Sequence, residues 1–345
     1  MLACAAMLTC GAASLRAASP ATYVNPVLRH GQDPWIVKYD GRYYYCCATG
    51  SGIAVSASSD LHRISRPRVV WTAPGKGWNR SCIWAPELHP YGGRWYIYYA
   101  AGESGPPFIH QRTGVLESVD DDPMGPYVDR GMLYTGDTPG VPGSNRWSID
   151  FTLLEYGGKL YGIWSGWADA ADTDKTEQNL YIAEMSDPCT VSSPRVLISE
   201  PDRQYEQGPL PLNEGPQVLR SGDDLFIVYS CGQSWLSSYK LSYLKLKPGA
   251  DPMRRASWTK SRRPVFEGTD EVFGVGHASF TTSPDDTEHY IVYHSKIAPE
   301  PGWNRDVRIQ RFGFDRRGRP VFGRPVPAGV PLPLPSGSIT CPSEK

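Results

Sequence analysis

Four acidic residues and one histidine recur along the 345-residue chain at intervals of one repeat. They are Asp33, Glu87, Asp150, Glu214 and His277, separated by 54, 63, 64 and 63 residues. Two carboxyl groups on opposite sides of a sugar can hydrolyse a glycosidic bond, because one activates a water molecule and the other protonates the leaving oxygen. Hydrolysis with inversion needs these two groups about 6.5–9.5 Å apart, which leaves room for the water.

The neighbours of three of these carboxyl groups indicate separate roles. Asp33 precedes Pro34, whose ring fixes the local backbone and so orients the carboxylate, and we predict that Asp33 is the general base. Glu214 precedes Gly215, which permits a close approach, and its longer side chain favours the general acid. Asp150 would raise the pKa of Glu214 by like-charge proximity and keep it protonated.

The elements that must position these residues form a fivefold repeat. Each copy has a polar residue, an apolar strand, a turn and a second apolar strand that is mostly rich in Tyr. Four turns contain the small residues typical of tight hairpins, namely Asp40-Gly41, Gly92-Gly93, Gly157-Gly158 and Gly222-Asp223. Repeats of this length fit four-stranded blades, so we predict an all-β, single-domain, five-bladed β-propeller. The first strand of each blade lines the central channel, and the five polar residues should converge at one mouth.

Six short motifs occur in order at the blade spacing. They are Gln32-Asp33-Pro34-Trp35, Trp84-Ala85-Pro86-Glu87, Ser148-Ile149-Asp150, Asn213-Glu214-Gly215-Pro216, Gly276-His277-Ala278-Ser279-Phe280 and Arg308-Ile309-Gln310. On these motifs the chain resembles glycoside hydrolase family 43, the arabinofuranosidase and xylosidase family. The resemblance implies the base, the pKa modulator and the acid at Asp33, Asp150 and Glu214. It also implies a structural calcium ion near the channel axis, beside His277 and held largely through water, which the chemistry does not require.

Other residues are candidates for contact with the sugar. Trp35 and Trp84 each lie beside a motif carboxylate and are candidate stacking platforms. The resemblance favours Arg308 as a substrate-binding residue, with Arg305 as the other candidate. Glu87 is predicted to be structural or to line the channel, since buried carboxylates are usually paired.

The predicted reaction is the release of L-arabinofuranose from arabinan or arabinoxylan of plant cell walls. The opening Asn25-Pro26-Val27-Leu28 resembles relatives that cleave arabinofuranosides. Two long loops, Ala101 to Arg112 and Ala168 to Gln178, could close one end of the channel and favour action at chain ends.

Four alternatives differ in the sugar, the mechanism or the class of protein. A β-xylosidase would share the same three carboxylates. A retaining fructan-type hydrolase is disfavoured because Gln32 and Trp35 replace the asparagines that usually flank the aspartate. A non-catalytic sugar-binding propeller would repeat its binding residues in every blade, and a scaffold for protein partners would not need four acids at one mouth.

The charge composition of the chain indicates which classes of partner it can bind. Lys and Arg (35) balance Asp and Glu (36) without a long basic run, which argues against nucleic-acid binding.

Residues 1–19 are predicted to be a signal peptide, although the first basic residue, Arg16, follows the apolar run. Residues 20–336 are predicted to form the catalytic propeller and residues 337–345 a tail. No later segment is apolar enough to span a membrane. We expect a monomer that is secreted or periplasmic, with Cys10 as a candidate for lipid attachment.

The remaining cysteines bear on metal binding and on disulfides. Cys46, Cys47, Cys82, Cys189, Cys231 and Cys341 show no C-x-x-C spacing. A thiolate metal site is therefore not expected, whereas one or two disulfides are compatible with an oxidising compartment.

Overall fold

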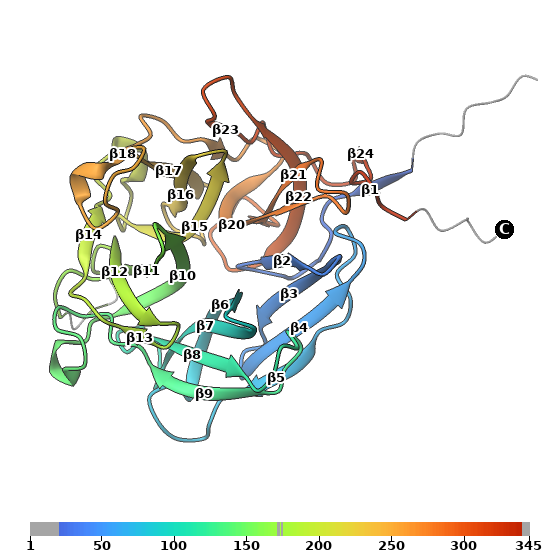
Figure 1. Ribbon diagram of the computed structural model, residues 1–345. Helices are drawn as coiled ribbons and strands as arrows, with labels where there is room; N and C mark the ends of the chain where they lie inside the picture. The colour runs from blue at the N-terminus through green and yellow to red at the C-terminus, as the bar shows by residue number, and fades with distance from the viewer. Residues whose placement is uncertain (1–20, 171–172, 174, 340–345) are drawn as a thin grey trace, which may run out of the picture.

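The computed structural model describes residues 21–170, 173 and 175–339. Within this part of the chain, five antiparallel sheets of four or five strands account for nearly all regular structure. Figure 1 shows the sheets arranged in chain order around a central axis, as the blades of a propeller. Three short 3-10 turns, η1 (Pro142–Ser144), η2 (Gln204–Glu206) and η3 (Arg255–Ser257), lie in the connections. The predicted all-β, five-bladed propeller is confirmed.

Each blade runs from an innermost strand to an outer edge. Blade 1 has β2 (Trp35–Tyr39), β3 (Arg42–Ala48), β4 (Gly52–Ser58) and β5 (Arg68–Thr72), and blade 2 has β6 (Ser81–Tyr91), β7 (Arg94–Gly102), β8 (Arg112–Ser118) and β9 (Tyr127–Met132). Blade 3 has β10 (Ser148–Tyr156), β11 (Lys159–Gly166), β12 (Asn179–Asp187), β13 (Thr190–Val191) and β14 (Val196–Ser199). Blade 4 has β15 (Asn213–Ser221), β16 (Asp224–Cys231), β17 (Lys240–Leu246), β18 (Trp258–Lys260) and β19 (Phe266–Glu267). Blade 5 has β20 (Phe273–Thr282), β21 (His289–Lys296), β22 (Arg305–Phe314) and β23 (Pro320–Val321).

The four predicted tight turns join the two inner strands of blades 1 to 4. Between β6 and β7, Gly92 and Gly93 have φ angles of 58° and 77°, which favour glycine. Tyr91 is then paired with Arg94 across the turn. This turn fixes the register between β6 and β7, the two strands of blade 2 nearest the channel.

Apolar side chains fill the five interfaces between neighbouring blades. Between blades 3 and 4, for example, Ile163, Ile182 and Ile227 are fully buried in one cluster. Comparable clusters lie at the other four interfaces. Burial of one such side chain contributes about 1.5–3 kcal/mol. The blades are thus held face to face, and their innermost strands surround the channel.

The two ends of the propeller meet at the interface between blades 1 and 5. The short strands β1 (Thr22–Val24) and β24 (Pro331–Pro333) are paired, as Figure 1 shows beside blade 5. Farther along, the side-chain amide of Asn25 donates to the carbonyl of Ile309 at 2.8 Å, and the N–H of Val27 donates to the carbonyl of Val307 at 2.9 Å. The N-terminal segment therefore docks on β22 and closes the ring.

The described cysteines do not form the expected disulfides. Cys46, Cys47, Cys82, Cys189 and Cys231 are all free thiols. No disulfide therefore joins any two of these five residues. Cys341 and the predicted signal peptide, residues 1–19, lie outside the described residues, as do positions 171, 172 and 174 of the predicted loop Ala168 to Gln178.

The helices in the described part of the chain are short. None of its helices has the length and apolar character needed to cross a bilayer.

Candidate active site

Five residues at equivalent places in the blades have a left-handed backbone. They are Asp33 (φ 45°), Ala85 (φ 41°), Asp150 (φ 55°), Gly215 (φ 54°) and His277 (φ 45°). In blades 2 to 5 they coincide with register shifts between the two inner strands, which mark β-bulges. A bulge redirects a side chain, and strained backbone of this kind concentrates at functional sites. The repeat therefore places Asp33, Asp150 and His277 in equivalent orientations at the channel.

The predicted ring of five equivalent polar residues is wrong for blades 2 and 4, where Ala85 and Gly215 hold the equivalent positions. Glu87 lies two positions after Ala85, and Glu214 lies one position before Gly215. Glu87 instead accepts hydrogen bonds from Gln217 and from Nε2 of His89, the latter at 2.9 Å. Burial raises its pKa to about 8. Glu87 is thus a buried carboxyl group with hydrogen-bond partners on β6 and β15, and its structural role stays a prediction.

Asp33 faces three basic side chains at the interface between blades 1 and 5. Its Oδ1 lies 3.1 Å from Nη1 of Arg305 and 3.5 Å from Nδ1 of His277. Its backbone N–H donates to Nδ1 of His294 at 3.2 Å. Burial alone would raise the pKa of Asp33, but Arg305, His277 and His294 hold that pKa far below its ordinary value. Asp33 is therefore ionised at neutral pH.

Asp150 and Glu214 form a buried pair joined through the backbone. The N–H of Gly215 donates to Oδ2 of Asp150 at 2.9 Å, and the hydroxyl of Tyr239 donates to Oε1 of Glu214 at 2.8 Å. Burial is the main cause that raises the pKa of both carboxyl groups, and the negative charge of Asp33 raises each further. The pKa of Glu214 is therefore shifted in the opposite direction from that of Asp33.

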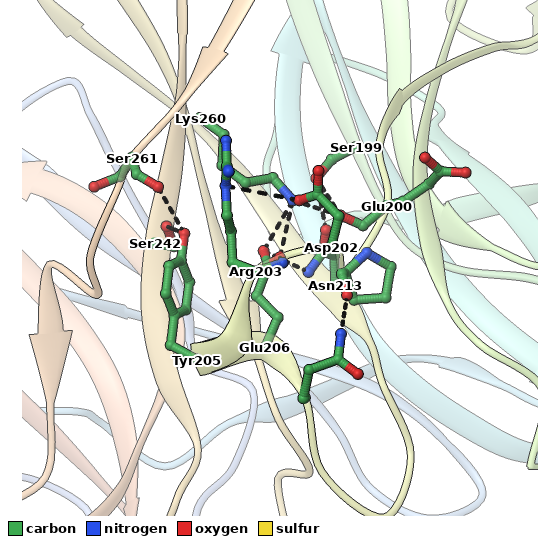
Figure 2. Close-up of polar contacts among 12 residues, drawn as sticks. Ser199, Glu200, Asp202, Arg203, Tyr205, Glu206, Asn213, Ser242, Lys260 and Ser261 are labelled. Carbon is green, nitrogen blue, oxygen red and sulfur yellow. Dashed lines mark hydrogen bonds and ion pairs between the residues drawn. The ribbon is translucent and has the colours of Figure 1, made fainter.

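A buried network fixes the residue that precedes Glu214 (Figure 2). The side-chain amide of Asn213 donates to Oε1 of Glu206 at 3.0 Å, and the hydroxyl of Ser199 donates to Oδ1 of Asn213 at 2.6 Å. Lys260 pairs with Oε2 of Glu206 at 2.9 Å. Both ends of the Asn213 amide are thus held, which restrains the backbone beside Glu214.

His277 lies between Asp33 and the strand that carries Glu214. A Cβ atom on Gly215 would lie 3.2 Å from Nδ1 of His277, so glycine is needed there for space as well as for its positive φ. The close approach predicted for Gly215 is confirmed. The backbone N–H of His277 donates to the hydroxyl of Ser230 at 2.8 Å, which anchors the main chain of His277 to blade 4.

The surroundings of His277 do not fit a calcium ion held directly by the protein. Calcium takes six to eight oxygen ligands. The residues that the structure describes contain no group of three or more His, Cys, Asp or Glu side chains able to hold a metal ion. A water-held ion beside His277 stays a prediction, and the reaction proposed below has no step through it.

Of the two predicted stacking platforms, Trp35 is engaged between blades 1 and 2. Its indole N–H donates to the carbonyl of Leu88 at 2.7 Å, and its ring packs 4.5 Å from that of His89. These contacts are those of a residue that joins two blades. A sugar-stacking role for Trp35 stays a prediction.

Trp84 belongs to an aromatic cluster near Asp150. Its ring meets Phe108 edge-on at 5.0 Å, and it packs against the cluster that contains Trp147, Trp167 and Ile149. The indole N–H of Trp147 donates to the carbonyl of Phe108 at 2.7 Å. The connection between β7 and β8 is thereby fastened over blades 2 and 3, where it can wall the site as predicted for the loop Ala101 to Arg112.

Arg305, rather than Arg308, reaches the carboxylates. Arg308 is buried in blade 5, where its Nε donates to the hydroxyl of Ser295 at 2.6 Å and its Nη1 to the carbonyl of Val326 at 2.9 Å. Arg305 pairs with Asp33. The guanidinium of Arg308 thus supports the C-terminal segment, and a contact between Arg308 and the substrate stays a prediction.

Two further residues at the site escaped the sequence reasoning. Tyr239 binds Glu214 and stacks on His294, with ring centroids 5.4 Å apart. Trp303, two positions before Arg305, has 56% of its surface exposed. Both lie in connections between strands outside the repeated motifs. The only sequence signal was the closeness of Trp303 to an arginine already considered.

Comparison with known protein families shows which family the chain belongs to. The family model described as glycosyl hydrolases family 43 matches residues 23–320. The chain belongs to glycosyl hydrolase family 43. The resemblance predicted from the six motifs is confirmed, and the protein is a glycosidase.

Relatives of this family 43 chain have related activities in their names. It is 33% identical to an extracellular exo-alpha-(1->5)-L-arabinofuranosidase of Streptomyces avermitilis, over 96% of this chain and 70% of that protein. It is 32% identical to alpha-L-arabinofuranosidase B of Pyricularia oryzae, over 90% of this chain and 65% of that protein. The chain thus spans about two thirds of the length of these curated relatives.

Solved structures share the family 43 fold. The crystal structure of an alpha-L-arabinofuranosidase from Lactobacillus brevis superposes with a TM-score of 0.81 at 31% identity, covering 89% of this chain and 98% of that one. A thermostable family-43 glycoside hydrolase superposes with a TM-score of 0.75 at 25% identity, covering 92% of this chain and all of that one (100%).

Proposed function

We propose that the protein is an inverting, exo-acting α-L-arabinofuranosidase in which Asp33 is the general base and Glu214 the general acid. One observation carries the assignment of roles. The pKa of Asp33 is held far below its ordinary value, whereas burial raises the pKa of Glu214. Carboxyl groups whose environments move their pKa values apart are suited to act as base and acid at the same pH.

The reaction follows from these protonation states. The ionised Asp33 takes a proton from a water molecule, whose oxygen attacks the anomeric carbon while the bond to the leaving oxygen breaks. Glu214 donates its proton to that leaving oxygen. Among the described residues, the side-chain contacts of Asp33 all involve Oδ1, so Oδ2 is the oxygen that can accept the proton.

Asp150 is proposed to adjust the acid rather than to react. The negative charge of Glu214 raises the pKa of Asp150, and we propose that a charge on Asp150 disfavours ionised Glu214 in return, because two like charges are unfavourable in a buried site. The N–H of Gly215 donates to Asp150 and favours its ionised form. The proposed mechanism assigns the proton of the pair to Glu214, which then donates it to the leaving oxygen.

The proposed substrate is an α-linked L-arabinofuranose at the end or side chain of arabinan or arabinoxylan. Support comes from three relatives with arabinofuranosidase in their names that are 32–34% identical over at least 90% of the chain. Two relatives are named exo-acting and extracellular, which supports action at chain ends and secretion. The loop fastened by Phe108 and Trp147 also supports a site that is closed on one side.

Proton NMR of the products tests both the substrate and the stereochemistry. The purified protein is given 4-nitrophenyl α-L-arabinofuranoside and, in a parallel sample, 4-nitrophenyl β-D-xylopyranoside. We expect β-arabinose to appear before its mutarotation to the α anomer. Initial release of α-arabinose would contradict inversion, and release of xylose alone would replace the proposed sugar.

A further inference from the structure

We infer that Trp235 and Trp303 form a binding subsite for the sugar that carries the leaving oxygen. We call these two residues the indole pair. The inference rests on the proposed function, because it names the part of the substrate that lies beyond the cleaved arabinofuranose. The ligand class is a neutral furanose or pyranose ring that offers an apolar C–H face to an indole.

The indole pair is built by two connections at the same end of blades 4 and 5. Trp235 lies between β16 and β17, and Trp303 lies between β21 and β22. Their ring centroids are 4.9 Å apart at an interplanar angle of 45°. The backbone N–H of Gly302 donates to the carbonyl of Trp235 at 2.9 Å, and Lys296 donates to the carbonyl of Gly302 at 2.7 Å. The pair is therefore held by the backbone and does not depend on ring contact alone.

Each connection also reaches one of the two proposed catalytic carboxyl groups. The guanidinium of Arg305 lies 5.6 Å from the ring centroid of Trp303 and pairs with Asp33. The connection that carries Trp235 ends at Tyr239, which binds Glu214. The indole pair is thus connected to the base through Arg305 and to the acid through Tyr239.

Exposure places the indole pair at the rim of the site. Trp303 is 56% exposed, whereas every other tryptophan is half-buried or buried. Asp150 and Glu214 are buried, so the arabinofuranose that is cleaved must enter beyond the rim. The next sugar, which keeps the leaving oxygen, then lies at the level of the exposed indole. A solvent-facing indole offers an apolar face with a polar edge, which suits a sugar ring.

The test compares two substrates that differ only beyond the scissile bond. Methyl α-L-arabinofuranoside has no second sugar, whereas α-(1→5)-arabinobiose has one. We expect Trp303→Ala to lower the ratio of kcat/KM for arabinobiose to kcat/KM for the methyl glycoside by about tenfold. Trp303→Phe, which retains an aromatic face, should recover most of that ratio.

A matched control is Tyr39→Ala, which removes an exposed aromatic ring from the far end of β2. It should leave the ratio at the wild-type value. An unchanged ratio in Trp303→Ala, or an equal loss on both substrates, would overturn the indole pair as a subsite while the proposed function stands. A wild-type protein that cleaves neither substrate would overturn the proposed function and the inference together.

Discussion

Asn213 donates a hydrogen bond to Glu206 at 3.0 Å, and it is the residue immediately before Glu214. Glu206 is fully buried and pairs with Lys260, whose side chain is also buried. A buried ion pair thus supports the backbone of the proposed general acid from the outer side of blade 4. Figure 2 shows how many polar groups converge on this one carboxylate.

Glu206→Gln should destabilise the fold, because Lys260 would lose the buried charge that pairs with it. Breaking one side of a buried pair costs about 3–5 kcal/mol, and Asp202, 2.9 Å from Lys260, should compensate in part. We expect the free energy of unfolding in urea to fall by about 3 kcal/mol. The control is Glu184→Gln, whose partner Lys159 is exposed, with an expected change below about 1 kcal/mol. Similar losses in both variants would contradict the special weight given to Glu206.

The proposed base and acid should respond differently to the leaving group. Asp33→Asn removes the base, so kcat should fall by about 10²–10⁴-fold on every substrate. Glu214→Gln should cause a comparable loss on arabinobiose but a much smaller one on the 4-nitrophenyl glycoside, because nitrophenolate leaves without a proton. Steady-state kinetics with both substrates checks this pattern. Equal losses for Glu214→Gln on the two substrates would reject it as the acid.

Two substitutions should move the alkaline limb of the pH profile in opposite directions. Glu214 acts when protonated, so activity is lost as the pH rises through its pKa. Asp150→Asn removes a like charge and should lower that pKa, moving the limb to lower pH by about one pH unit. Tyr239→Phe removes a donor that stabilises the carboxylate and should move the limb to higher pH. Profiles of kcat/KM against pH distinguish these shifts from a uniform loss of activity.

Arg305 should control the acidic limb. It is the main positive charge that lowers the pKa of Asp33, and the base must be ionised to act. Arg305→Met should therefore raise that pKa and move the acidic limb of kcat/KM to higher pH. Arg308→Met, which removes contacts to Ser295 and Val326, should lower stability and leave the limb in place. A shifted limb in the Arg308 variant would contradict the assignment of this effect to Arg305.

Glu87 should make stability depend on pH. Its pKa is raised to about 8 in the folded protein because it is buried, whereas an unfolded glutamate titrates near 4.5. Between these values the folded state binds more protons than the unfolded state, so stability falls as the pH rises. Glu87→Gln should reduce this decline, to which the raised pKa values of Asp150 and Glu214 also contribute, and the change would be seen as a flatter dependence of the urea midpoint between pH 5 and pH 8. An unchanged slope would mean that Glu87 is ionised in the fold.

The spacing of the four acids and His277 predicted the propeller. It did not predict which position of each innermost strand is equivalent to Asp33. Asp33, Asp150 and His277 share one position because each begins a bulge with positive φ. At the same position blade 2 has Ala85 and blade 4 has Gly215. Repeat spacing varies by a few residues between blades, so the sequence could not separate Glu87, two positions on, from the true equivalents. Only the register of the paired strands distinguishes them.

The other partners of the site depend on connections whose course no repeat predicts. Trp35 resembles a platform in sequence because it follows Asp33, yet its indole joins two blades. Trp303 and Tyr239 lie far from any motif acid in sequence and reach the site through folded loops. Arg305 and Arg308 both belong to the start of β22, and they point to different surroundings because side chains alternate along a strand. An offset of three residues along β22 decides which arginine contacts Asp33.

The docking of the N-terminal segment on blade 5 has a consequence for the order of assembly. The hydrogen bond between Asn25 and Ile309 joins residues 284 positions apart, so it pays its loop-closure entropy only when almost the whole chain is available. The contact between Asp33 and Arg305 spans the same junction of blades 1 and 5. Blades 2 to 4 can form from local hairpins as the chain emerges, but the pairing of Asp33 with Arg305 must wait for the ring to close. Catalytic competence is therefore acquired at the end of folding, and an unfinished chain remains inert.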